Sequence, residues 1–298
     1  MSDMNHKINF FYFNLLTFLL INFNLSVGAQ TLSFKAQTEA SPIEVYANNG
    51  IEWQREKKVF IARGAARAIQ GEVTVFADEL IAYYRETSSQ ETDVYRIDAL
   101  GNVTIKSLNE IARGSAAVYD FELDVLVIEG SPSKLETSDG IVTSNDTIQF
   151  WGKEDIAVAK GNAFAERGNN KLLADTLVAR FDNQNSSKPE ALDNTSKISV
   201  IEGFGNVKLE TNNGEIIMGD RGKYDLVSEI AVVDGNVKIR SENNQMRGGF
   251  AVVDTVKGIS TLYPTLKESG YSASFAKPRV SALLVPKPKK VKQLISSD

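Results

Sequence analysis

One strand pattern recurs along the whole chain and constrains the fold more than any other feature. Residues 201–209 place apolar or small residues at every second position around a central Gly-Asn pair. Five further copies follow the pattern, closely at 97–105 and 233–239 and more loosely around Gly64, Gly130 and Gly161. Successive central glycines are 37, 29, 31, 44 and 30 residues apart. This spacing indicates an internal repeat, in which stacked units share one continuous core.

Each repeat contains a second strand, in which a small residue and an aspartate precede alternating apolar residues. Copies of this second strand begin at Ala77-Asp78, Asn145-Asp146 and Ala174-Asp175, and a variant ends in Tyr-Asp at Tyr119-Asp120 and Tyr224-Asp225. Clusters of Asn, Gly, Asp and Ser separate the runs, as expected for turns between strands. Helical periodicity is not sustained anywhere. The chain is therefore predicted to be all-β, with about a dozen or more strands between residues 45 and 265.

The recurring glycine predicts where each strand bends. Alternate residues of a strand point to opposite faces, and the central glycine always falls on the apolar face. Glycine inside a strand is typical of a bend, a bulge or a close backbone approach. Strands bent at one level fold a stacked sheet into a trough with an apolar inside. The expected bend positions are Gly64, Gly101, Gly130, Gly161, Gly205 and Gly235.

Composition excludes several classes of function. The net charge is −5, which gives no reason to expect a nucleic-acid partner. The chain has no cysteine, and its only histidine is His6. A Ser-His-Asp triad, a Cys-His dyad and a histidine-ligated zinc site therefore cannot form once an N-terminal leader is removed. Acidic residues recur periodically on the outer face instead of converging, so the sequence predicts neither an enzyme nor a metal or cofactor site.

The ends of the chain differ from the repeat region. Residues 1–29 resemble a secretory signal peptide with a cleavage site before Gln30, and an uncleaved membrane anchor is the alternative. A flexible lead-in is expected over 30–44, and a surface loop over 183–196. Residues 266–298 are rich in Pro and Lys and are predicted to be mostly disordered. Within them, 277–298 hold six basic residues and one acid.

From the residues alone, three functions for such a trough stay open. Its inside can be closed by its own side chains, as in a structural solenoid. It can stay partly open and hold an apolar ligand. It can also support a carbohydrate-active enzyme, which the missing His and Cys disfavour.

The export signal and the ordered strand copies resemble the LptA/OstA-like family of periplasmic lipopolysaccharide-transport proteins. The resemblance covers residues 42–262, and its specificity lies in the six ordered copies, since Gly-Asn-Val alone is common. It implies a bent, twisted, V-shaped β-jellyroll that shields lipopolysaccharide acyl chains. It also implies a periplasmic bridge, peripheral to both membranes, from an inner-membrane export complex to an outer-membrane translocon. The implied partners are lipopolysaccharide, the inner- and outer-membrane Lpt components through edge-strand pairing, and a head-to-tail copy of the chain. A structural β-solenoid, or a membrane-anchored LptC-like or LptD N-terminal-like component of the same pathway, is the alternative.

Candidate lipid contacts follow from parity, because they share the inward face with the glycines or with the apolar side of the second strands. For each of them, core packing is the competing explanation. They are Leu80, Ile97, Val103, Ile105, Leu126, Ile128, Ile148, Phe150, Leu177, Phe181, Val207, Leu209, Val237 and Ile239.

Overall fold

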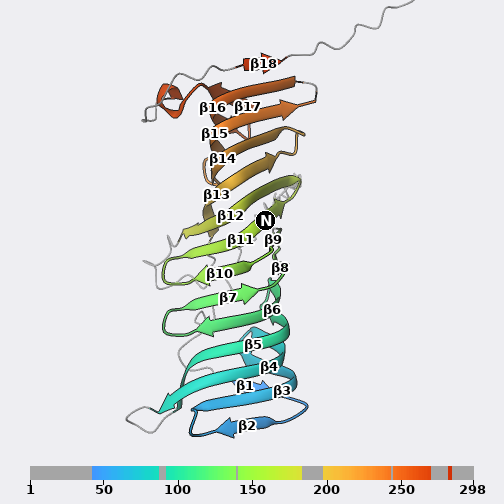
Figure 1. Ribbon diagram of the computed structural model, residues 1–298, viewed down its shortest axis with the longest axis vertical. Helices are drawn as coiled ribbons and strands as arrows, with labels where there is room; N and C mark the ends of the chain where they lie inside the picture. The colour runs from blue at the N-terminus through green and yellow to red at the C-terminus, as the bar shows by residue number, and fades with distance from the viewer. Residues whose placement is uncertain are drawn as a thin grey trace, which may run out of the picture.

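The protein is one antiparallel β-sheet that stacks along a single long axis (Figure 1). The computed structural model describes residues 42–86, 92–138, 140–182, 197–242, 244–269 and 281–283. Its first nine strands are β1 (Glu44–Tyr46), β2 (Ile51–Gln54), β3 (Val59–Gln70), β4 (Val73–Glu86), β5 (Thr92–Lys106), β6 (Ile111–Asp120), β7 (Val125–Glu129), β8 (Ser133–Glu136) and β9 (Ile141–Ser144). The rest are β10 (Thr147–Trp151), β11 (Ile156–Arg167), β12 (Asn170–Asp182), β13 (Lys197–Glu210), β14 (Ile216–Asp225), β15 (Ile230–Ser241), β16 (Asn244–Asp254), β17 (Ile259–Tyr263) and β18 (Ser281–Leu283), with a 3₁₀ turn, η1 (Leu266–Ser269), before β18.

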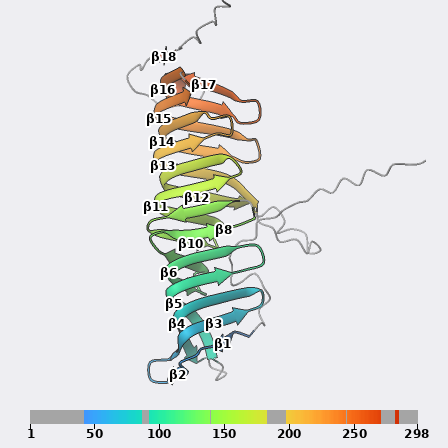
Figure 2. The same cartoon turned by 90° about the vertical axis from the view of Figure 1, so that its right-hand side faces the viewer.

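The strands form rungs of two kinds. Ten long strands, β3–β6 and β11–β16, each cross the full width of the sheet. Four pairs of short strands, β1/β2, β7/β8, β9/β10 and β17/β18, each make one interrupted rung. For example, β1 pairs with one half of β3 and β2 with the other half. Figure 2 shows the rungs curving between two sides of the stack. The predicted all-β, bent and stacked antiparallel sheet is thus confirmed.

The two sides of the stack are its two rims. The first rim contains the turns that join β3 to β4, β5 to β6, β8 to β9, β11 to β12, β13 to β14 and β15 to β16. The second rim contains the turns that join β2 to β3, β6 to β7, β10 to β11, β14 to β15 and β16 to β17. Every rung therefore has a half next to the first rim and a half next to the second rim.

A β-bulge lies between the two halves of five long strands, at the recurring glycine. Gly64, Gly101, Gly161, Gly205 and Gly235 have φ between +73° and +90°. The residue after each also has a positive φ, from +44° to +50°. The register with every neighbouring long strand shifts at these points, with one extra residue on the glycine strand. Two consecutive left-handed residues suit Gly and Asn better than other residues, which is the physical basis of the Gly-Asn pattern.

The aspartate of the second-strand motif lies across the sheet from the bulge. Asp78 Oδ2 accepts a hydrogen bond from Asn102 Nδ2 at 2.8 Å, and a Cβ added at Gly101 would stand 2.2 Å from the same oxygen. The same arrangement recurs at the other bulges: Asp146 lies over Gly161, Asp175 over Gly205 and Asp220 over Gly235, and Asn49 lies over Gly64. The Gly-Asn motif and the aspartate motif therefore lie on neighbouring strands and meet at the same bend.

Gly130 departs from the prediction. It lies between β7 and β8, outside any strand, and is not among the glycines with positive φ. The Ser131–Pro132 peptide bond follows it, and proline cannot donate a ladder hydrogen bond. The rung is interrupted here instead of bulged, so the bend is made by a break in the strand.

The core fills the inside of the bend as two clusters. The larger cluster runs from β3 to β13 and the smaller from β14 to β16. Small residues such as Ala66, Ala77, Ala99 and Ala163 flank the bend and are buried, while larger aliphatic residues lie farther out along each half. The two halves of the sheet can approach each other closely where the side chains are small.

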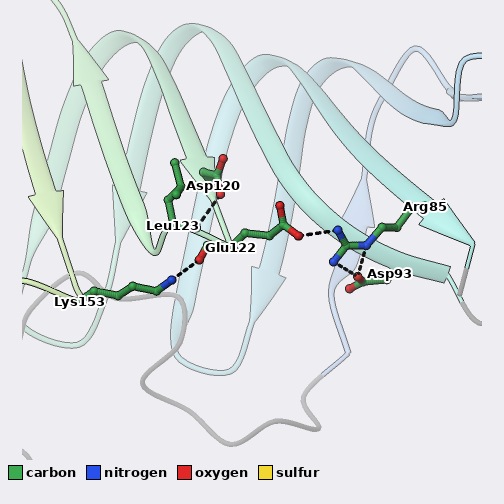
Figure 3. A network of polar contacts seen from close by, with 6 residues as sticks. All are labelled: Arg85, Asp93, Asp120, Glu122, Leu123 and Lys153. Carbon is green, nitrogen blue, oxygen red and sulfur yellow. Dashed lines mark hydrogen bonds and ion pairs between the residues drawn. The ribbon is translucent and has the colours of Figure 1, made fainter.

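Repeated turns and ion pairs fix the second rim. Asp120, the last residue of β6, accepts a hydrogen bond from the Leu123 amide at 2.8 Å, and Asp225 and Asp254 do the same in the equivalent turns. Figure 3 shows that Arg85 of β4 binds both Asp93 of β5 and Glu122 of the next turn. Lys153 donates to the Glu122 carbonyl at 2.5 Å, so successive turns along the rim are connected.

The ends of the chain are described only in part. The predicted signal segment and the predicted loop over 183–196 lie outside the described residues. Within the predicted disordered tail, residues 281–283 form β18 and pair with β16. They lie in a window without proline between Pro278 and Pro286, which leaves the backbone N–H groups needed for pairing.

Candidate functional site

The inner face of the bend is the candidate functional site. Eleven of the fourteen residues selected by parity are buried: Leu80, Val103, Ile105, Leu126, Ile128, Ile148, Phe150, Leu177, Val207, Val237 and Ile239. Ile97, Phe181 and Leu209 are partly buried. Parity therefore separated the inner from the outer face.

The structure distributes these residues over both core clusters. The larger cluster contains those from Leu80 to Val207, with Ile97 packed against it. Val237 and Ile239 belong to the smaller cluster, and Leu209 packs against it. Phe181 is in neither. The selected residues thus form a long apolar face that continues through most rungs, not one local pocket.

The outer face of the same strands carries exposed and charged side chains. Phe204, next to the Gly205 bulge, is 43% exposed, and Leu100 occupies the equivalent position in β5 with 41% exposed. Lys208 forms an ion pair with Glu210. Outer-face residues of β13 therefore give a control set that includes one large apolar side chain.

Side chains from the two halves close the inner face in this structure. Val207, for example, approaches both Gly203 of its own strand and Gly222 of β14, since Cβ atoms added there would lie 3.2 and 3.1 Å from its methyl groups. Gly203 and Gly222 are paired across the two strands. A ligand can occupy such a face only if side chains or the two halves of the sheet move apart.

The N-terminal end of the stack leaves apolar side chains uncovered. Val45 of β1 and Ile51 and Trp53 of β2 are 37%, 52% and 50% exposed, because no further rung among the described residues covers the outer edge of these strands. The Trp53 ring stacks on Phe60, and its Nε1 donates to the Tyr84 hydroxyl at 2.7 Å. Trp151, the other tryptophan, is partly buried within the stack and donates to Gln149.

Glu110 is a buried acid that sequence reasoning missed. It is 6% exposed, and its Oε2 has no hydrogen-bond partner within the described part of the chain. A cavity of about 340 Å³ at the first rim is lined by Glu110, Ser107 and Thr137, among others. Burial raises the pKa of Glu110 to about 7, and the nearby Ser107 hydroxyl opposes this only in part. The turn 107–110 looks ordinary in sequence, so no local signal marks this residue.

The described residues give no metal-binding cluster and no membrane-spanning helix. Groups of three or more His, Asp or Glu side chains able to hold a metal ion are absent from the described ranges. Within the same ranges, no helix has the length and apolar character to cross a membrane.

Comparison with known proteins gives a family match and several matching solved structures. Residues 141–259, from β9 to the start of β17, match the family described as "LptA/(LptD N-terminal domain) LPS transport protein". The crystal structure of LptH, the LptA-homologous periplasmic component of the lipopolysaccharide transport device of Pseudomonas aeruginosa, is 19% identical. The match covers 49% of this chain and 94% of that chain, with a TM-score of 0.39. No curated protein matches the sequence. The family match confirms the resemblance seen in the strand repeats and identifies residues 141–259 as an LptA/OstA-like segment.

Proposed function

We propose that this protein is a periplasmic carrier that shields the acyl chains of lipopolysaccharide along the inner face of its bent sheet. The observation that carries the proposal is the continuous apolar inner face, which runs through both core clusters and reaches an uncovered end at Trp53. The match of residues 141–259 to a lipopolysaccharide-transport family supports the same cargo.

The energetics of the cargo explain why a long apolar face is useful. Moving an acyl chain of about a dozen methylene groups into water costs on the order of 10 kcal/mol, at about 0.8 kcal/mol for each. A lipid with several chains therefore cannot cross an aqueous compartment at a useful rate unaided. A face that remains apolar from rung to rung lets the chains slide without meeting water, while the sugars stay outside.

Loading requires the bend to open. The inner side chains pack against each other in this structure, and the lipid must replace those contacts with its own. Small residues near the bend keep the halves close, and the glycine bulges provide the flexible line about which they can separate. The packed inner face equally favours a second candidate, a structural solenoid whose inside never holds a ligand.

Within the described residues the sheet ends in an unpaired edge on each side, and these two edges suit the bridging role. Edge strands carry unpaired N–H and C=O groups that can pair with a strand from another chain. At the N-terminal end, β1 and β2 present such an edge with apolar side chains beside it. Pairing there with membrane-bound Lpt components would continue the apolar face from one protein to the next. The export signal predicted over residues 1–29 would place the carrier in the periplasm.

Site-specific photocrosslinking in cells tests the cargo. A photoreactive residue is placed at Ile105, Phe150 or Leu209 on the inner face, and at Lys208 on the outer face as the matched control. We expect lipopolysaccharide to be crosslinked from the inner positions and not from Lys208. Labelling at Lys208 alone would contradict the proposal. Absence of labelling at every position in a folded protein would favour the structural solenoid.

A further inference from the structure

The turn that joins β5 to β6 places two polar side chains where the inner face meets the first rim. Ile105 of β5 pairs with Ala112 of β6, and both are buried in the core. Two residues farther out, Ser107 and Glu110 lie opposite each other, and the Ser107 amide donates to the Glu110 carbonyl at 3.0 Å. Side chains alternate between the two faces of paired strands, so positions 107 and 110 share the inner side with 105 and 112. The apolar inner face therefore ends in a hydroxyl and a carboxylate at this turn.

The Glu110 carboxylate and the Ser107 hydroxyl are buried without satisfying partners. Glu110 is 6% exposed. Its Oε2 and the Ser107 Oγ make no hydrogen bond of normal geometry within the part of the chain that the structure describes, although the hydroxyl lies near enough to lower the pKa of the carboxyl. Buried polar groups are nearly always paired, because burial removes the water that they would otherwise bind. The two oxygens are therefore neighbouring acceptors for donors that another molecule would supply.

Both residues line a cavity of about 340 Å³ at the first rim. The neighbouring turn, which joins β8 to β9, contributes Thr137 and Ser138 to the same cavity. The Thr137 hydroxyl is engaged within its own turn, where it donates to the Gly140 carbonyl at 3.2 Å and accepts from the Gly140 amide at 3.1 Å. Binding sites for small molecules usually have about 300–1,000 Å³. The cavity therefore has room for a small molecule, with Glu110 and Ser107 as the acceptors that can hold it.

The other charged side chains of the cavity already have partners on the outer face. Lys106 and Glu136 follow buried residues of β5 and β8 by one position, so they point outward. The Lys106 Nζ lies 5.5 Å from the centre of the Phe76 ring, and Glu136 forms ion pairs with Arg113 and Lys134. Among the described lining residues, this leaves one uncommitted carboxylate, the buried one of the β5/β6 turn.

We propose that this cavity binds a small molecule through a primary ammonium group, with the Glu110 carboxylate and the Ser107 hydroxyl as its acceptors. One uncommitted carboxylate matches one positive charge, and an ammonium group carries three N–H donors that fit closely spaced acceptors. A divalent cation needs more oxygen ligands, and the described residues hold no cluster of three or more acids around one point. The site lies at the mouth of the inner face, so the ammonium group can belong to a lipid head group or to a free amine. The inference does not rest on the proposed cargo.

Thermal unfolding of the full chain in the presence of ethanolamine tests the site. A ligand that binds only the folded state raises the unfolding midpoint as its concentration increases. We expect ethanolamine to raise the midpoint at pH 8. Choline has the same charge but no N–H donor, and ethylene glycol is neutral, so these two are the matched probes. We expect their apparent dissociation constants to be about tenfold or more higher than that of ethanolamine.

A variant and a change of pH test the carboxylate itself. Glu110→Gln keeps the shape of the side chain and removes its charge, and Glu72→Gln, at an exposed acid of the neighbouring β3/β4 turn, is the matched control. The pKa of Glu110 is about 7, so about 90% of the carboxyl groups are ionised at pH 8 and about 1% at pH 5. We expect the apparent dissociation constant of ethanolamine to rise about tenfold or more in Glu110→Gln, and also at pH 5 in the unmodified protein. In Glu72→Gln it should stay within about twofold.

Three results would overturn the proposal. They are the absence of a midpoint shift with ethanolamine at pH 8, a shift of equal size with choline or ethylene glycol, and a shift that survives both Glu110→Gln and pH 5. Because the pH 5 measurement uses the unmodified protein, the test does not depend on the folding of the variant.

Vesicles distinguish the two sources of the ammonium group. Binding to phosphatidylethanolamine vesicles but not to phosphatidylcholine vesicles, lost in Glu110→Gln, supports the site and assigns it to a lipid head group. An ethanolamine shift without vesicle binding supports the site and assigns it to a free amine. Crosslinking of lipopolysaccharide from Phe150 is read separately, so failure of this site and failure of the proposed function are distinguishable.

Discussion

Replacing Gly205 by alanine tests the structural basis of the bend. Gly205 has φ +73°, and an added Cβ would lie 2.1 Å from Asp175 Oδ2. The left-handed conformation costs a residue with a Cβ about 1–2 kcal/mol. The displaced carboxylate also loses its hydrogen bonds from Asn206 Nδ2, of 3.0 and 3.1 Å, worth about 1 kcal/mol at an exposed site. We therefore expect Gly205→Ala to lower the free energy of unfolding by about 2–3 kcal/mol, measured by urea denaturation.

Two comparisons separate the contributions. Gly214 has φ +75° but nothing within 4 Å of an added Cβ, so Gly214→Ala should carry the conformational cost alone. In an Asp175→Ala background the crowding disappears, and Gly205→Ala should cost about 1 kcal/mol less than in the unmodified chain. If Gly205→Ala costs no more than Gly214→Ala, or its cost does not change in the Asp175→Ala background, the explanation of the Asp-Gly-Asn arrangement is refuted.

Three further predictions concern a titrating group, the core and the rim. The folded-state pKa of Glu110 is about 7 against an ordinary 4.5, so the free energy of unfolding should fall by about 3 kcal/mol or less as pH rises from 4.5 to 7 and then level off. Glu110→Gln should remove this pH dependence, measured by urea denaturation at pH 5 and 8. An unchanged pH dependence in the variant would contradict the assignment. Ile128 is fully buried, so Ile128→Ala should lower the free energy of unfolding by about 2–5 kcal/mol. Val127→Ala, on the opposite face, should lower it by less than about 1.5 kcal/mol. Equal losses for the two variants would contradict the assignment of faces. The Arg85–Glu122 ion pair is half exposed, so Arg85→Ala should cost less than about 1 kcal/mol in thermal unfolding, and a larger loss would show that the rim network is cooperative.

Periodicity predicted the fold class because the repeat is local. Burial of Val103, Val207 and Val237 follows from the alternation of side chains along one strand, which needs no knowledge of neighbours. The glycine positions also followed from local physics, since a Gly-Asn pair inside a strand signals left-handed backbone. Gly130 shows the limit, because the proline two residues later decides whether the strand bends or breaks.

Contacts between residues far apart in the sequence could not be predicted from the strand patterns. Asp78 and Gly101 are 23 residues apart, and the strand pattern alone places the aspartates only on the outer face. Their position over the bulges follows from the register of neighbouring strands, which no single-strand pattern contains. Glu110 and β18 were missed for a related reason. A buried acid in a turn and a three-residue strand in a proline-rich tail depend on what the rest of the fold places beside them.

A photocrosslinking scan through β13, from Ile201 to Leu209, tests the central claim most directly. Within this strand Val207 and Leu209 lie on the inner face, whereas Phe204 is a large apolar residue on the outer face. If the inner face holds the acyl chains, lipopolysaccharide labelling should alternate with parity and include Val207 and Leu209 but not Phe204. Labelling that follows exposed hydrophobicity, strongest at Phe204 and weak at Val207 and Leu209, would contradict it.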